Sequence, residues 1–311
     1  MLRPLFMIAF TFTLIIQVRA DVLASDQQTP ASPSVTVPFD GSNNLIVITA
    51  MVNNTGPYRF AIDTGSSEHF ISRETANALG LNRAGTAHLD VGRKEMTDAE
   101  LTNIAELRIG ELILRNQRFF VGPLPKSYPF QGILGAELFK QFVVTIDFAH
   151  SLVSLAAPDK FVYSNSASRI SIKQRDRSIP QVHAKVDGHA GWFKIDTGYN
   201  GSLALFAEFV AAHKSLSNAN SLQVSEPGGQ TMAGEVPNTR IILIKLFTLE
   251  TVGSSYAREV VQRELAAALF TEKGGSDSAY AGAIGTLVLR HYRVTFNYRQ
   301  RLMILETISA P

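Results

Sequence analysis

Residues 59–70 read RFAIDTGSSEHF, and this stretch decides how the whole chain is interpreted. An apolar strand leads to Asp63, which is followed by Thr and Gly. The pattern returns at residues 192–203, WFKIDTGYNGSL, where Asp196 has the same neighbours. One three-residue motif is weak evidence, because short motifs recur by chance. Two copies with matched flanking residues indicate a common origin.

A second pair of matched segments indicates that the chain is a tandem duplication. Residues 135–155 align with residues 285–305 without a gap. Each segment begins at a glycine that follows two apolar residues, Ile-Leu in the first half and Ala-Ile in the second. The order strand, Asp-Thr-Gly, β-rich middle, apolar-apolar-Gly, short helix and hairpin thus occurs twice. Because a repeat sets the organisation of a chain, we expect two homologous lobes.

The local signals in each half are mostly those of β-strands. Residues 43–62 read as two strands joined by an Asn/Gly/Pro turn. Asp187-Gly188 marks a hairpin turn in the second half. Short helices are expected at 72–79 and 204–213, after each Asp-Thr-Gly, and after each apolar-apolar-Gly. The predicted fold class is therefore all-β, with two homologous lobes and short helices related by a pseudo-twofold axis.

The second half is longer between its two motifs. Asp63 and Gly135 are 72 residues apart, whereas Asp196 and Gly285 are 89 apart, a difference of 17. We assign the extra residues to 254–270, whose apolar residues recur at helical spacing. The sequence therefore predicts an additional helix there, which either caps its own lobe or lines a cleft or docks a partner.

The first twenty residues have the pattern of an export signal. Arg3 precedes an apolar run that ends in the small-residue sequence VRA at residue 20. The uncharged run, 4–18, is shorter than the roughly 20 residues that a spanning helix needs. We therefore predict a cleaved signal peptide over 1–20, with an uncleaved membrane anchor as the alternative.

Composition changes mark the remaining boundaries. Residues 21–34 are polar and predict a tether. The N-terminal lobe is expected at 35–157 and the C-terminal lobe at 169–308. Between them, 158–168 is polar and rich in small residues, which is typical of a linker.

Charge and cysteine content exclude several classes of function. Removing residues 1–20 takes away two arginines, which leaves 27 basic and 27 acidic residues. This balance gives no electrostatic case for nucleic acid, or for a membrane beyond the export signal. The absence of cysteine excludes disulfides, thiolate metal sites and a Cys nucleophile. The seven histidines show no paired spacing, so we expect no metal and no cofactor. Export without cysteine favours a bacterial envelope, hence a periplasmic or secreted protein.

Two aspartates brought to one place have a natural chemical use. Carboxylates within hydrogen-bonding distance share a proton, because both cannot ionise at low cost. One is then a base that activates water, and the other is an acid that protonates a leaving nitrogen. The flanking glycines let two backbones approach, and the threonine hydroxyls can satisfy buried amides across the seam.

Residues 35–308 resemble the aspartyl protease family, which includes pepsin-like and retroviral-type proteases. The resemblance rests on the motifs AIDTGSS with ILG and KIDTGYN with AIG. The short lobes look like its compact bacterial, retropepsin-like branch. The resemblance implies an acid-protease fold in which the apolar-apolar-Gly strand passes beneath the Asp-Thr-Gly loop. It implies an aspartic endopeptidase that binds a peptide or protein substrate between its lobes. Because both lobes are in one chain, a monomer is sufficient for catalysis. The implied catalytic pair is Asp63 and Asp196. The implied supporting residues are Thr64, Gly65, Ser66, Thr197 and Gly198.

One departure from the family pattern concerns the second loop. Ser66 matches the serine that in this family often hydrogen-bonds the aspartate, but Tyr199 takes its place in the second half. We therefore hypothesise that Asp196 holds the shared proton. The alternative is that Asn200 or Ser202 supplies the missing donor.

Other features leave the function open. Pepsin-like enzymes carry a tyrosine on a flap over the cleft, but residues 82–100 contain no tyrosine. Residues 226–235 are a second candidate for the flap, and we assign no flap residue in either segment. His69 is expected at the surface, without a catalytic role. The alternative function is a non-catalytic peptide-binding or structural protein that retains the fold. Sequence alone does not predict the substrate specificity.

Overall fold

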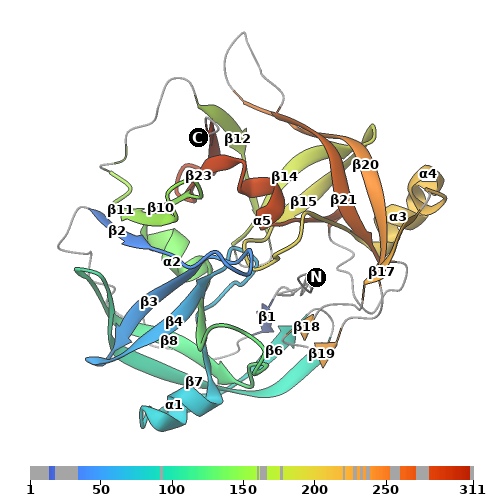
Figure 1. The fold of residues 1–311 in the computed structure, drawn as a ribbon. Helices are drawn as coiled ribbons and strands as arrows, with labels where there is room; N and C mark the ends of the chain where they lie inside the picture. Colours follow the sequence, from blue (N-terminus) through green and yellow to red (C-terminus); the bar gives the residue numbers. More distant parts are fainter. Residues whose placement is uncertain are drawn as a thin grey trace, which may run out of the picture.

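The computed structural model describes residues 14–17, 34–91, 94–159, 161, 167–175, 178–219, 221–226, 230–231, 234–235, 239–252, 260–270 and 280–308. Within them, each half of the chain forms an eight-stranded sheet, and both halves contribute to a six-stranded sheet. In Figure 1 the first-half strands β3, β4, β7 and β8 lie at the lower left, and the second-half strands β14, β15, β20 and β21 at the upper right. The predicted all-β fold with two homologous lobes is confirmed.

The sheet of the N-terminal lobe has the order β1-β6-β7-β3-β4-β9-β5-β8. Its strands are β1 Leu14–Gln17, β3 Val47–Val52, β4 Thr55–Ile62, β5 Phe70–Ser72, β6 Arg83–Val91, β7 Lys94–Ile109, β8 Leu112–Gly122 and β9 Gly132–Leu134. The helices of this half are α1 Arg73–Ala78 and α2 Ala136–Gln141. Both helices lie where the sequence predicted them.

The sheet of the C-terminal lobe has the order β13-β14-β15-β22-β16-β21-β20-β17. Its strands are β13 Lys173–Arg175, β14 Ile179–Val186, β15 His189–Ile195, β16 Leu203–Leu205, β17 Ser221–Glu226, β20 Thr239–Leu249, β21 Val260–Leu269 and β22 Gly282–Ile284. A small two-stranded sheet joins β18 Gln230–Thr231 to β19 Gly234–Glu235. The helices of this half are α3 Ala207–Ala212, α4 Lys214–Ser217 and α5 Thr286–Leu289.

The two lobes share one topology around the Asp-Thr-Gly loops. In the first, β9 pairs in parallel with β4 and antiparallel with β5, the strands before and after the loop. In the second, β22 pairs in the same way with β15 and β16. The apolar-apolar-Gly segment of each half is therefore the strand between the two arms of the loop, as the resemblance implied.

The predicted extra helix at 254–270 is wrong where the structure describes the segment. Residues 260–269 form β21, which pairs antiparallel with β20 and in parallel with β16. In the first lobe β8 pairs with β7 and β5 in the same two ways, so β21 is the counterpart of β8. Pairing with strands on both sides overrides the helical spacing of its apolar residues. Residues 253–259 lie outside the described part of the chain.

The six-stranded sheet joins the halves. Its order is β12-β24-β23-β10-β11-β2, formed by β2 Ser34–Pro38, β10 Val143–Asp147, β11 Leu152–Ala156, β12 Ser168–Ser171, β23 Tyr292–Asn297 and β24 Leu302–Thr307. At its centre Thr145 pairs with Thr295, its counterpart in the repeat, and the two hydroxyl oxygens lie 2.8 Å apart. The pseudo-twofold axis expected from the duplication passes through this pair.

Two hairpin turns form where the sequence predicted them. Asn53 and Asn54 join β3 to β4 with φ of 47° and 61°. Asp187 and Gly188 join β14 to β15 with φ of 46° and 85°. Positive φ at both turn residues suits the twist of a two-residue hairpin, and Asn, Asp and Gly adopt it at the lowest cost.

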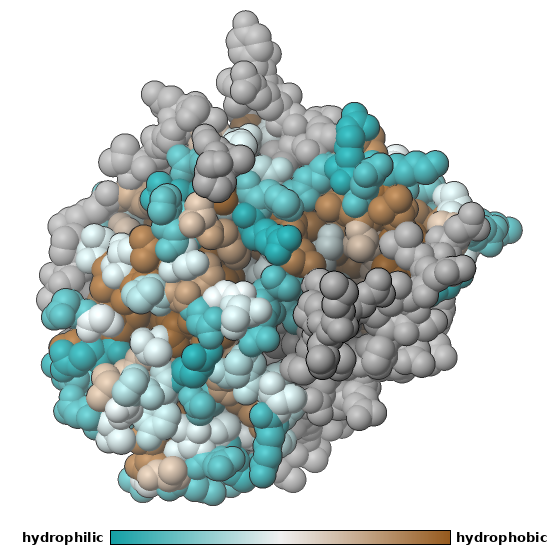
Figure 2. Space-filling view, viewed as in Figure 1, coloured by the Kyte–Doolittle hydropathy of each residue, from teal (hydrophilic) through white to brown (hydrophobic). Residues whose placement is uncertain are grey.

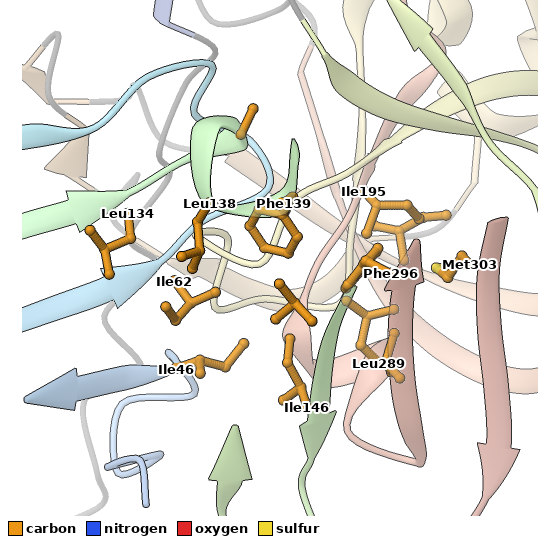
Figure 3. Close-up of a cluster of buried hydrophobic side chains, with 14 of the residues drawn as sticks. Ile46, Ile62, Leu134, Leu138, Phe139, Ile146, Ile195, Leu289, Phe296 and Met303 are labelled. Atoms are coloured by element: carbon orange, nitrogen blue, oxygen red, sulfur yellow. The ribbon is translucent and has the colours of Figure 1, made fainter. Parts of the chain in front are cut away.

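The hydrophobic core continues from each lobe into the six-stranded sheet. Figure 3 shows Ile62 and Ile195, the residues just before the two aspartates, in one cluster with Ile146 and Phe296 of that sheet. The ring of Phe139, from α2, packs edge-on against Phe296 at a centroid distance of 5.6 Å. Both Asp-Thr-Gly loops are thus seated on one continuous apolar base. On the face shown in Figure 2, hydrophobic residues gather in one patch at the left and another at the upper right, with hydrophilic residues around them.

The domain boundaries at 1–20, 21–34 and 158–168 remain predictions. Most of the first 33 residues lie outside the described part of the chain, as do 162–166. Within the described part, none of the helices is both long and apolar enough to span a bilayer.

Candidate active site

Thr64 and Thr197 hold the two Asp-Thr-Gly loops together. Each threonine amide donates to the other's hydroxyl, Thr64 N to Thr197 Oγ1 at 2.9 Å and Thr197 N to Thr64 Oγ1 at 3.0 Å. Each hydroxyl then donates across the seam, to the carbonyl oxygens of Ile195 and Ile62, both at 2.8 Å. These four buried bonds leave little freedom in the relative position of the loops, because each would be costly to leave unmade.

The two carboxylates are buried and share a donor. Asp63 is 0% and Asp196 1% exposed. Gly198 N donates to Asp63 Oδ1 and to Asp196 Oδ1, each at 3.1 Å, and Gly65 N donates to Asp63 Oδ1 at 2.7 Å. A β-carbon on Gly65 would lie only 2.4 Å from Asp196 Oδ1. Glycine there allows the carboxylates of the two halves to meet.

A second matched set of contacts fixes each loop on its lobe. The amides of Asp63 and Asp196 donate to the carbonyls of Leu134 and Ile284, both at 3.0 Å. A β-carbon on Gly135 would come within 2.3 Å of a carbonyl oxygen of the passing loop, and one on Gly285 would do the same. The glycine of each apolar-apolar-Gly motif is therefore required by the close passage of backbone.

The residues after each Asp-Thr-Gly differ between the lobes. The Ser66 hydroxyl donates to the carbonyl of Glu68 at 2.9 Å, where the resemblance suggested the aspartate. The Tyr199 hydroxyl, in a side chain 2% exposed, donates to the carbonyl of Leu203 at 3.2 Å. The Asn200 amide donates to the carbonyl of Asn43 at 3.3 Å, which ties the second loop to the first lobe.

Lys194 is the residue of this site that sequence analysis missed. Its Nζ lies 2.9 Å from Asp196 Oδ2, and both side chains are at most 3% exposed. Residues two apart on a strand face the same side, so a lysine two before Asp196 is placed to meet it. At the matched position the first lobe has Ala61. The available signal was a charged residue inside a strand that is otherwise apolar.

Aromatic residues from both lobes are buried together, and Tyr128 among them interacts with the pair. Tyr128 and Phe130, from the loop before β9, and Phe206, after β16, belong to one buried cluster. Burial raises the pKa of the Tyr128 hydroxyl, and the negative charges of Asp63 and Asp196 raise it further. A tyrosine in this setting stays protonated and can donate a hydrogen bond.

His69 is not at the surface, contrary to our expectation. It is 1% exposed, its Nδ1 accepts from Gly135 N at 3.1 Å, and its ring lies 4.9 Å from that of Phe119. Burial lowers the pKa of this imidazole to about 4. The neutral ring thus braces the glycine beneath the first loop.

Two expectations find no test in these contacts. The side chains of 87–98, which form most of the candidate flap segment 82–100, and those of 220–239, which contain the segment 226–235, lie outside the description. Within the described residues, no three His, Asp or Glu side chains gather as a metal site would require.

The fold and the paired loops define a two-lobed protein of the acid-protease type. A model of the aspartyl protease family matches residues 48–138, a segment that contains Asp63 but ends before Asp196. The resemblance to aspartyl proteases is therefore confirmed, on that segment and on the fold.

Among solved structures, the chain is similar to the basic 7S globulin from soybean. The TM-score is 0.53 and the identity 12%, with 89% of this chain and 95% of that chain covered. At this identity the likeness shows the fold alone. No curated protein sequence matches the chain.

Proposed function

We propose that the protein is an aspartic endopeptidase that cleaves peptide bonds between its two lobes, with Asp63 and Asp196 as the catalytic pair. The observation that carries the proposal is the single amide, Gly198 N, that donates to both carboxylates. Two buried carboxylates so close together share one proton, because a second negative charge is costly there.

The pair then performs hydrolysis without a covalent intermediate. The ionised carboxylate accepts a proton from water as the water oxygen bonds to the substrate carbonyl carbon. The protonated carboxyl gives its proton to the leaving nitrogen as the carbon–nitrogen bond breaks. The products are a carboxylic acid and an amine, and transfer of one proton between the two carboxyls restores the starting state.

Cleavage of a mixed peptide library tests the proposal. Purified protein would be incubated from acid to neutral pH beside Asp63→Asn and Asp196→Asn. Asp187→Asn is the matched control, because this aspartate lies in a surface turn whose positive φ asparagine also adopts. We expect the wild type and the control to cleave peptides, and both dyad variants to cleave none. Intact peptides at every pH, with the wild type folded, would refute it.

The alternative is a non-catalytic binding or structural protein, and one observation favours it. The buried ammonium of Lys194 already occupies one oxygen of Asp196. In this case the wild type would retain peptides on equilibrium dialysis without cleaving them. The same library then distinguishes binding from catalysis.

We also propose that the chain is exported to the periplasm or secreted, on the pattern of its first twenty residues. Expression in a bacterial host followed by fractionation and N-terminal sequencing tests this. Asp21 at the N-terminus of the released protein supports a cleaved signal. An intact Met1 in the membrane fraction supports the anchor instead.

A further inference from the structure

Lys194 breaks the equivalence of two loops that are otherwise closely matched. The bonds of Thr64 and Thr197 across the seam and the backbone bonds of the Asp63 and Asp196 amides repeat from lobe to lobe, with equivalent partners and similar lengths. In the part of the chain that the structure describes, the buried ammonium of Lys194 lies 2.9 Å from the second carboxylate, whereas its counterpart in the first half, Ala61, carries no charge. The charge of the site is therefore asymmetric even though its backbone is nearly symmetric.

The surroundings of Lys194 leave its ammonium directed at the pair. On the neighbouring strands Lys194 is paired with Gln181 of β14 and Ala283 of β22, neither of which carries a charge. The Phe206 ring centroid lies 5.9 Å from Nζ. Among the described residues, the titratable groups that face the site are Asp63, Asp196, Tyr128 and Tyr298, and burial keeps both tyrosines neutral.

The ammonium of Lys194 balances the negative charge of the carboxyl pair. With one proton on the carboxyl pair, Lys194, Asp63 and Asp196 together have zero net charge, whereas the pair alone would carry one negative charge. A buried site favours the neutral total. An ammonium in contact with one carboxylate also favours the ionised form of that carboxylate over the other.

We propose that Lys194 is a positioning residue of the carboxyl pair: its ammonium keeps Asp196 ionised as the base and leaves the proton on Asp63 as the acid. This inference rests on the proposed function, since it assigns the two roles within it. It replaces the hypothesis drawn from Tyr199, under which Asp196 held the proton. No covalent step involves the lysine, which retains its own protons throughout the reaction.

The pH dependence of kcat/KM tests the assignment. The substrate is a peptide identified by the library, and the variants are Lys194→Met and Lys185→Met. The control lysine lies on the adjacent strand β14 and faces Glu250 at 3.7 Å on the exposed surface. In Lys194→Met both limbs of the profile should move to higher pH, by about 1 to 3 pH units, because the carboxyl pair loses a nearby cation. In Lys185→Met the limbs should stay in place.

A lysine that merely packs gives a different result. Lys194→Met would then lower activity equally at all pH values, with the limbs unmoved, and the proposal would be overturned. A shift of the limbs to lower pH would overturn it as well.

A second measurement does not depend on activity. Carbon-13 NMR of protein labelled at the aspartate carboxyl carbons follows both groups, with Asp63→Asn and Asp196→Asn used to assign the signals. In wild-type protein we expect the first proton taken up on acidification to appear on Asp63. Uptake by Asp196 first would overturn the proposal even if Lys194→Met fails to fold. If no peptide is cleaved but Asp63 takes up the proton first, the proposed function fails and the charge assignment stands.

Discussion

Replacing His69 by asparagine should remove a large part of the acid sensitivity of the fold. The imidazole pKa is about 4 in the folded protein because the ring is buried, against 6.5 as the ordinary value. At pH values between these two pKa values, the unfolded chain therefore binds a proton on His69 that the folded chain does not bind. The free energy of unfolding must fall as the pH decreases from 6.5 to 4, and it levels off below that.

The size of the effect follows from the two pKa values. Each pKa unit corresponds to about 1.4 kcal/mol, so His69 alone makes the folded state about 3 kcal/mol less stable in acid than at neutral pH. That is a large share of the net stability of an ordinary domain, which is about 5–15 kcal/mol. On this account the folded protein is more stable near neutral pH than in strong acid.

Urea denaturation at several pH values between about 7.5 and 4.5 measures the effect. Asparagine at 69 can place its side-chain oxygen near the position of Nδ1, so it can still accept from Gly135 N. The variant is expected to be less stable at neutral pH, since the contact with Phe119 is lost. Its stability should nevertheless change with pH by about 3 kcal/mol less than that of the wild type.

The control is His150→Asn, in which the substituted imidazole is 72% exposed. That imidazole lies 3.0 Å from Asp147, and losing this exposed pair should change the pH dependence of stability by less than about 1 kcal/mol. Equal pH slopes in His69→Asn and wild type would refute the reasoning, because they would show that the buried ring takes up its proton in the folded state.

Three further predictions concern residues around the same loops. Thr64→Val removes the partner of two buried backbone groups and should lower the free energy of unfolding by about 2–5 kcal/mol in urea denaturation, while Thr36→Val, at an exposed pair, should change it by less than about 1 kcal/mol. Gly135→Ala places a β-carbon 2.3 Å from a backbone carbonyl oxygen, so a thermal melt should show a protein that is unfolded or strongly destabilised; a wild-type melting temperature contradicts this. Burial raises the pKa of Glu68 above 4.5, so the ionised side chain lowers the free energy of unfolding of the wild type as the pH rises past that value. Glu68→Gln should therefore become more stable relative to wild type over the same interval. A difference in stability that does not change with pH would contradict this prediction.

Features that depend on local chemistry or on the repeat could be predicted from the sequence. The Asn53-Asn54 and Asp187-Gly188 turns form because these residue types tolerate positive φ. The gapless alignment identified Thr145 and Thr295 as equivalent residues, and the structure pairs them at the centre of the six-stranded sheet. The two matched motifs likewise predicted that Asp63 and Asp196 lie close together.

Features that depend on distant partners could not be predicted in this way. Residues 260–269 have helical spacing, and only the open edges of β16 and β20 make them a strand. His69 is followed by a short helix and was expected at the surface, but backbone from Gly135 closes over it. Lys194 looks unfavourable in an apolar strand until its ion pair with Asp196 is known.

The six-stranded sheet has a consequence for the history of the molecule. Strand β10 of the first half borders β23 of the second, with Thr145 opposite its own counterpart. A chain that ended after the first half would therefore expose an open edge that matches itself. Two such chains could join through β10 in the same antiparallel register, and each would supply one Asp-Thr-Gly loop. The geometry of the central pair of strands is therefore that of a dimer of single lobes, which accords with the duplication in the sequence.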